Sequence, residues 1–77
     1  MKAKEIKRIV REYLSKKTPD GYYVIPAHRD ALKVLENLEG SLSIEEVGDM
    51  IVVKTKSRKI GEEVIRKLLT RNLLKRY

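Results

Sequence analysis

A chain of 77 residues is long enough for one domain with a modest core, so we expect residues 1–77 to form a single unit. The absence of cysteine excludes a disulfide framework and a thiolate metal site, and the longest apolar run is far too short to cross a membrane. Residues 1–19 contain seven basic and two acidic residues, residues 20–53 two and seven, and residues 54–77 nine and two. The net charge of +7 therefore divides into two basic ends around an acidic middle.

The first predicted element is an amphipathic helix over residues 3–16, in an N-terminal segment (1–17) that precedes a core of residues 22–77. Its apolar side chains recur every three or four residues: Ala3, Ile6, Ile9, Val10, Tyr13 and Leu14. The sequence TPDG at 18–21 stops this helix and turns the chain. The run YYVI then predicts a strand, which Pro26 ends unless it begins the next helix.

Two further helices are predicted with defined ends. The second covers residues 27–39, and Gly40 follows it where a left-handed cap is favoured. The third covers residues 57 to about 71, with Ser57 or Thr55 as its N-cap and Asn72 at its end. The last residues, LLKRY, then leave as an extended tail or a final strand, for which YYVI could be the partner.

The stretch from Ser43 to Thr55 allows two structures. A helix from Ser43 to about Val52 is favoured by the capping box SIEE and by apolar residues at helical spacing. A hairpin is favoured by Gly48-Asp49 as a type II′ turn and by the β-branched run MIVVKT. With Val47 paired to Met50, the hairpin places four apolar residues on one face: Leu42, Ile44, Ile51 and Val53.

The wider context favours the helix. The sequence RDALKVLENLEGSLSIEEVGDMI resembles the first two helices of winged-helix DNA-binding domains, and EEVIRKLLTRNLLKRY resembles their third helix and the strand that leaves it. This partial resemblance covers about residues 29–77, with Asn72 in place of the usual glycine and no segment for a full wing. It implies a mostly α fold with a small β component, in which an N-terminal helix accompanies a winged-helix-like three-helix core. The hairpin implies instead an α+β fold, a ferredoxin-like α-β-α-β-β-α module with the hairpin at 42–55.

No combination of residues indicates an active site, so we expect a protein that is not an enzyme and needs no cofactor or metal. His28 is the only histidine, and a lone histidine at a helix start is usually a surface or capping residue. Neighbouring glutamates on a helix point about 100° apart and do not form an acid/base pair. Ion pairs with Arg66 and Lys67, four residues later, explain Glu62 and Glu63.

The best candidate for a functional site is the basic sequence KTKSRK at 54–59, just ahead of a predicted helix. Cations and free backbone N–H groups at a helix start both favour phosphate. The winged-helix resemblance implies that the following helix enters the major groove of DNA. The predicted nucleic-acid-binding residues are Lys54, Lys56, Ser57, Arg58, Lys59 and Arg66. A secondary basic face is predicted on the N-terminal helix, at Lys4, Lys7, Arg8 and Arg11.

These observations predict a small nucleic-acid-binding protein, with DNA favoured over RNA and a role in transcription regulation implied by the resemblance. The alternative is an adaptor that binds RNA or protein in a replication, transcription or ribosomal assembly, with its acidic middle, residues 30–49, facing a basic partner. A homodimer through the N-terminal helix is a further possibility. The charged N-terminus predicts a cytoplasmic protein, and the abundance of Lys, Arg and Glu suits a thermophile.

Overall fold

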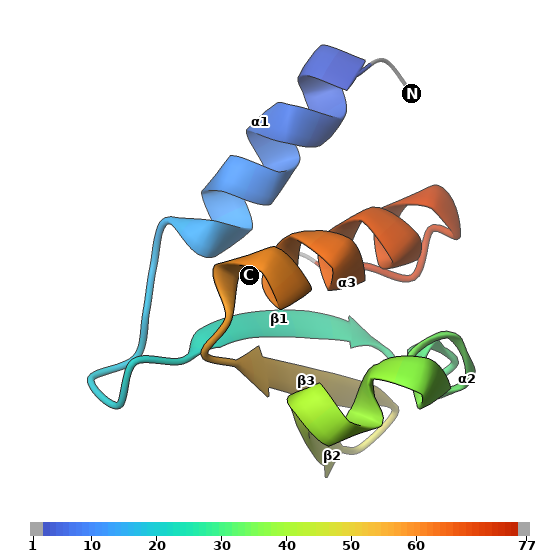
Figure 1. The fold of residues 1–77 in the computed structure, drawn as a ribbon. Coiled ribbons are helices and arrows are strands. Elements are labelled where there is room, and N and C mark those ends of the chain that lie inside the picture. Colours follow the sequence, from blue (N-terminus) through green and yellow to red (C-terminus); the bar gives the residue numbers. More distant parts are fainter. Residues whose placement is uncertain (1–2, 76–77) are drawn as a thin grey trace.

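The computed structural model describes residues 3–75, apart from the side chain of Glu39. These residues form a small α+β domain in which helices lie over one face of a three-stranded antiparallel sheet (Figure 1). The elements in chain order are α1 (Ala3–Leu14), β1 (Tyr23–His28), α2 (Ala31–Val34), the 3-10 helix η1 (Glu36–Ser41), β2 (Ser43–Val47), β3 (Met50–Thr55) and α3 (Arg58–Thr70). The strand order is β1-β3-β2.

The helix predicted from Ser43 to about Val52 is wrong, because these residues form the hairpin of β2 and β3. The three-helix core implied by the winged-helix resemblance lacks its middle helix, and the order of elements is that of the hairpin alternative. The run MIVVKT explains the outcome, since as β3 it buries every second side chain, Ile51, Val53 and Thr55. Burial on the sheet outweighs the local capping signal at Ser43.

The turn of this hairpin has the predicted geometry. Val47 pairs with Met50, so the loop contains only Gly48 and Asp49. Gly48 has a φ of +61°, whereas Asp49 is not among the residues with positive φ. A type II′ turn requires a positive φ at its first central residue only, and its twist matches that of the flanking strands.

Gly48→Ala is expected to lower the free energy of unfolding by about 1–2 kcal/mol, because a Cβ at this positive φ crowds the backbone. Gly40→Ala is the matched control, since its φ is not positive and an added Cβ would meet no atom within 4 Å. The control is expected to be neutral or stabilising by up to about 1 kcal/mol. Urea denaturation measures both, and equal effects in the two variants would contradict the assigned turn.

Strand β1 extends beyond Pro26, where the sequence predicts its end. Pro26 pairs with Val52 inside the ladder between β1 and β3. Its carbonyl accepts a hydrogen bond from the N–H of Lys75 at 3.0 Å, and the N–H of His28 donates to the carbonyl of Leu73 at 2.7 Å. The polar backbone groups here therefore face the C-terminal tail, and the missing N–H of proline removes no bond to β3.

The residues after α3 do contact β1, but at residues 26–28 and not at the YYVI residues predicted as their partner. The contact consists of one antiparallel bridge, Ala27–Leu74, and the two backbone hydrogen bonds beside it. The tail therefore lies along the edge of β1 that faces away from β3. Arg76 and Tyr77, which complete the LLKRY sequence, lie outside the described residues.

The helix predicted over residues 27–39 is reduced to a single turn, α2, followed by η1. Ala27 and His28 belong to β1 instead, because they pair with Ile51 and Met50 of β3. The predicted left-handed cap at Gly40 is also wrong, since this residue lies in η1 without a positive φ. Two apolar residues of this segment, Ala31 and Leu35, are nevertheless buried in the core.

The first and third predicted helices are confirmed, and so are the ends of α3. The Oγ of Ser57 accepts a hydrogen bond from the N–H of Ile60 at 3.3 Å, which makes Ser57 the N-cap. Asn72, just after the helix, has a φ of +56°. Asparagine tolerates this left-handed conformation better than most other side chains, so the chain can turn back towards β1.

Helix α1 packs against α3, β1 and the tail. It approaches α3 closely at Gly61, where an added Cβ would lie 2.9 Å from Cδ2 of Leu14. The hydroxyl of Tyr13 donates a hydrogen bond to the carbonyl of Lys75. The buried apolar residues come from α1, α2 and its C-cap Leu35, α3, β1 and β3: Val10, Tyr13, Leu14, Tyr23, Ile25, Ala27, Ala31, Leu35, Ile51, Val53, Val64, Ile65 and Leu68.

Candidate nucleic-acid interface

The basic sequence at 54–59 is divided between the end of β3 and the start of α3. Lys54 and Thr55 are the last residues of β3, Lys56 and Ser57 form the connection, and Arg58 and Lys59 begin α3. Because side chains alternate along a strand, Lys54 lies on the face of the sheet away from the core, between residues whose side chains are buried. The predicted site residues at 54–59 therefore lie at a corner where a strand ends and a helix begins.

Lys54 is partly neutralised. Its Nζ lies 3.1 Å from Oε1 of Glu45 on the neighbouring strand β2. The register places Lys54 opposite Ser43, so Glu45 is its diagonal neighbour on the same face. Glu45 thus competes with any phosphate for this ammonium group.

Two tyrosine rings, one just before β1 and one at its first residue, each contact the ammonium group of a lysine. The Nζ of Lys56 lies 5.1 Å from the centre of the Tyr22 ring, and the Nζ of Lys17 lies 4.8 Å from the centre of the Tyr23 ring. Each cation faces the negative side of an aromatic ring, an interaction of about 0.5–1 kcal/mol at an exposed site. Tyr23 pairs with Thr55, so the loop after α1 lies directly beside the connection from β3 to α3.

These contacts bring two basic stretches of the sequence together at one end of the domain. The loop after α1 and the start of α3 lie close to each other in Figure 1, and Leu14 packs on Gly61 between them. We call this region the basic end and define it as Lys16, Lys17, Lys56, Arg58 and Lys59. All five side chains belong to exposed residues, and the carboxylates Asp20 and Glu62 also lie there.

The exposed side of α3 beyond its start carries both acidic and basic side chains. Arg58 lies 4.0 Å from Glu62 and Lys67 lies 3.7 Å from Glu63, both across one turn of the helix. The predicted pair of Glu63 with Lys67 is therefore confirmed, whereas Glu62 faces Arg58 and not Arg66. Arg66 is exposed and lies about 10 Å along the helix axis from Lys59. It is not part of the basic end.

The predicted secondary face on α1 is present as a separate surface. Lys4, Lys7, Arg8 and Arg11 are all exposed. Among the residues that the structure describes, none of these four has a carboxylate within ion-pair distance. The apolar side of α1 faces α3 and the core, so these cations face solvent along the outside of the domain.

His28 is a surface residue beside Asp30. Its Nδ1 accepts a hydrogen bond from the N–H of Asp30 at 3.3 Å and lies 3.6 Å from the carboxylate of the same residue. Within residues 3–75, no three His, Asp or Glu side chains are grouped closely enough to hold a metal ion. The geometry around His28 is that of a local turn.

Three residues that contact lysines of this site were not predicted from the sequence: Tyr22, Tyr23 and Glu45. The sequence YYVI predicts only a strand, because the contacts of Tyr22 with Lys56 and of Tyr23 with Lys17 depend on the tertiary structure. Glu45 follows from the hairpin register, which places it beside Lys54. A helix over residues 43–52 would not place Glu45 beside Lys54.

Comparisons with protein-family models, with curated proteins and with solved structures found no match to this chain. No helix in residues 3–75 is both long and apolar enough to cross a membrane.

Proposed function

We propose that this chain is a small nucleic-acid-binding protein whose basic end holds phosphate groups. One observation carries the proposal: five exposed cations from two distant parts of the sequence gather around the start of α3. The N–H groups of a first helical turn and its dipole add to their attraction for an anion. The hydroxyl of Ser57 contributes indirectly, because its oxygen is engaged as the cap of α3.

The geometry favours contact through the end of α3 over insertion of its length into a groove. The buried side of α3 packs on β1 and β3, and its exposed side presents Glu62 and Glu63 among the cations. Phosphates would repel these carboxylates, so Arg66 makes at most a peripheral contact. Insertion of a recognition helix was the reason to prefer duplex DNA, and this geometry does not support it. Duplex DNA, single-stranded DNA and RNA are therefore all candidate ligands.

The direct test is a titration of fluorescently labelled duplex DNA, single-stranded DNA and structured RNA with the full chain at low salt. Contacts with about four phosphates predict that log K falls with log salt at a slope of about −3.6 on duplex DNA and about −2.8 on single strands. Absence of binding to all three probes at low salt would refute the proposal.

Lys54 adjoins the basic end, two residues before Lys56, and is held by Glu45 in an exposed ion pair of about 0–1 kcal/mol. Glu45→Gln releases it and is expected to strengthen nucleic-acid binding by about two- to fivefold. Glu36→Gln is the matched control. It removes the same charge from an exposed residue of η1 for which no ion pair is found among the described residues. Equal gains in both variants would indicate an effect of net charge alone and would exclude Lys54 from the interface.

We further propose that the domain is a ferredoxin-like module and not a winged helix. The order β1, a helical segment, β2, β3, α3 and a final bridging segment is that of a β-α-β-β-α-β unit. Across the sheet, the order tail-β1-β3-β2 supports the same assignment. In this proposal α1 is an additional N-terminal helix. An experimental structure of the chain, compared by topology with both folds, tests it.

A further inference from the structure

Strand β2 has an unoccupied edge. It pairs with β3 on one side, and within residues 3–75 no segment pairs with its other side. In a hairpin with a two-residue turn, the pair that closes the turn is hydrogen-bonded, and bonded and non-bonded pairs then alternate. Val47–Met50 closes this turn, so the backbone N–H and C=O groups of Ile44 and Glu46 point away from β3.

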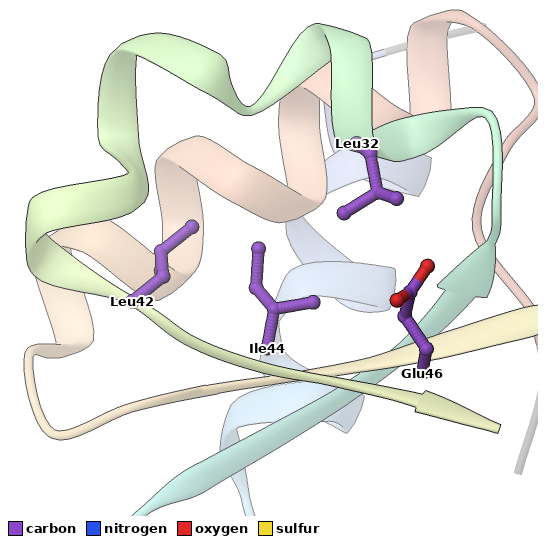
Figure 2. A pocket seen from close by; sticks show the side chains of 4 residues that line it. All are labelled: Leu32, Leu42, Ile44 and Glu46. Atoms are coloured by element: carbon purple, nitrogen blue, oxygen red, sulfur yellow. The ribbon is translucent and has the colours of Figure 1, made fainter.

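The side chains of the same two residues line a pocket. Together with Leu32 of α2 and Leu42, they surround a volume of about 310 Å³. In Figure 2 the side chain of Leu32 points from α2 towards those of Ile44 and Glu46 on β2. The pocket exists because α2 is only four residues long and leaves the inner face of β2 partly uncovered.

Carboxylates flank this edge on both faces of the sheet. Glu46 lies at the pocket, where its Oε1 is 3.2 Å from Nη2 of Arg29. Both side chains of that pair are more than half exposed, so another cation can easily replace Arg29 beside Glu46. Glu45, between Ile44 and Glu46, faces the opposite side of the sheet.

We propose that the β2 edge and its pocket bind an extended basic peptide segment of a partner protein as an added strand. Residues directly opposite each other in a sheet project from the same face. The partner residue opposite Ile44 therefore projects into the pocket and is apolar, and the one opposite Glu46 is lysine or arginine. In the antiparallel orientation, three successive partner residues lie opposite Glu46, Glu45 and Ile44. The first is a cation and the third is apolar. The middle position accepts any residue, and a second cation is favoured there because it lies opposite Glu45.

A second copy of this chain fits the edge poorly. Pairing two β2 strands antiparallel so that Ile44 lies opposite Glu46 of the other copy places the two Glu45 side chains opposite each other. Like charges directly opposite in a sheet are destabilising. In that arrangement Glu46 lies opposite Ile44 and gains no cationic partner. Charge complementarity therefore favours a basic strand over self-association.

The probe is a labelled peptide of sequence Thr-Arg-Lys-Ile-Thr-Val, titrated into the full chain and followed by fluorescence anisotropy and by the backbone amide signals of Ile44 and Glu46. Methylation of the backbone nitrogen of its isoleucine removes the donor that strand addition needs, and is expected to reduce affinity at least about tenfold. Equal binding of the methylated peptide, or of a scrambled one, would overturn strand addition in favour of charge attraction alone.

Charge exchange tests the orientation of the bound peptide. Glu46→Lys is expected to weaken the peptide about tenfold or more, and a peptide with glutamate in place of its arginine is expected to recover most of that loss. Asp20→Lys makes the same charge change at the other end of the sheet and is expected to have little effect. No binding of the original peptide would overturn the proposal, as would a concentration-dependent dimer whose β2 amides are protected. If neither the peptide nor a second copy binds, Glu46 would act as a charge that guards the edge.

Discussion

Simultaneous replacement of Lys56, Arg58 and Lys59 by alanine is expected to weaken binding of the chain to nucleic acid by about 10- to 100-fold at about 0.1 M salt. Each side chain lies at the basic end, and losing three phosphate contacts lowers the salt slope on duplex DNA by about 2.7. The loss is expected to be similar for different sequences, because phosphate contacts do not read bases. Fluorescence anisotropy over a series of salt concentrations measures both quantities.

The matched control is the triple replacement of Lys4, Lys7 and Arg11 by alanine. It removes the same charge from the outer face of α1, away from the basic end. We expect it to weaken binding by less than the first triple variant. If both variants lose the same affinity, the whole basic surface of the domain attracts the ligand and the basic end is not a site. Because all six side chains belong to exposed residues, we expect both variants to remain folded, which circular dichroism checks.

Ile25→Ala is expected to lower the free energy of unfolding by about 2–5 kcal/mol, which corresponds to a fall in Tm of about 10–30 °C for a domain of this size. Ile25 is 0% exposed on β1, the strand that contacts β3, both long helices and the tail. Its truncation leaves a cavity where the sheet meets α1 and α3. Thermal denaturation followed by circular dichroism measures the effect.

Val47→Ala is the control for this prediction. Val47 also lies in the sheet, but its side chain is on the edge strand and is 54% exposed. Removing its methyl groups is expected to change the free energy of unfolding by no more than about 0.5 kcal/mol. Comparable losses from Ile25→Ala and Val47→Ala would contradict the assignment of β1 to the core of the domain.

Long elements with a strong pattern were predictable from local sequence. The apolar residues of α1 recur at helical spacing, and α3 is bounded by Ser57 and Asn72, whose side chains suit a helix cap and a left-handed residue. These signals act within a few residues, so the rest of the fold did not need to be known. The YYVI strand was predictable as well, whereas the C-terminal residues contact β1 beyond it, at residues 26–28.

The middle of the chain was less predictable, because local and tertiary preferences disagree there. Ser43 begins a capping box, yet its segment is a strand because Ile51 and Val53 are buried in the sheet when β3 pairs with both β1 and β2. The same pairing takes Ala27 and His28 into β1 and shortens the helix that was expected to include them. The pairing of β1 with β3 joins distant parts of the chain, so the sequence around Ala27 contains no local sign of it.

The candidate site divides in the same way. Local sequence determined that cations precede a capped helix start, because Lys54 to Lys59 and Ser57 are neighbours in the chain. Only the tertiary structure decided which charges remain available. It placed Lys17 and Lys56 on tyrosine rings beside that helix start, and it placed Glu45 against Lys54. Short-range periodicity and capping act along the chain, whereas the electrostatics of a surface depend on distances in space, which the pairing of strands establishes.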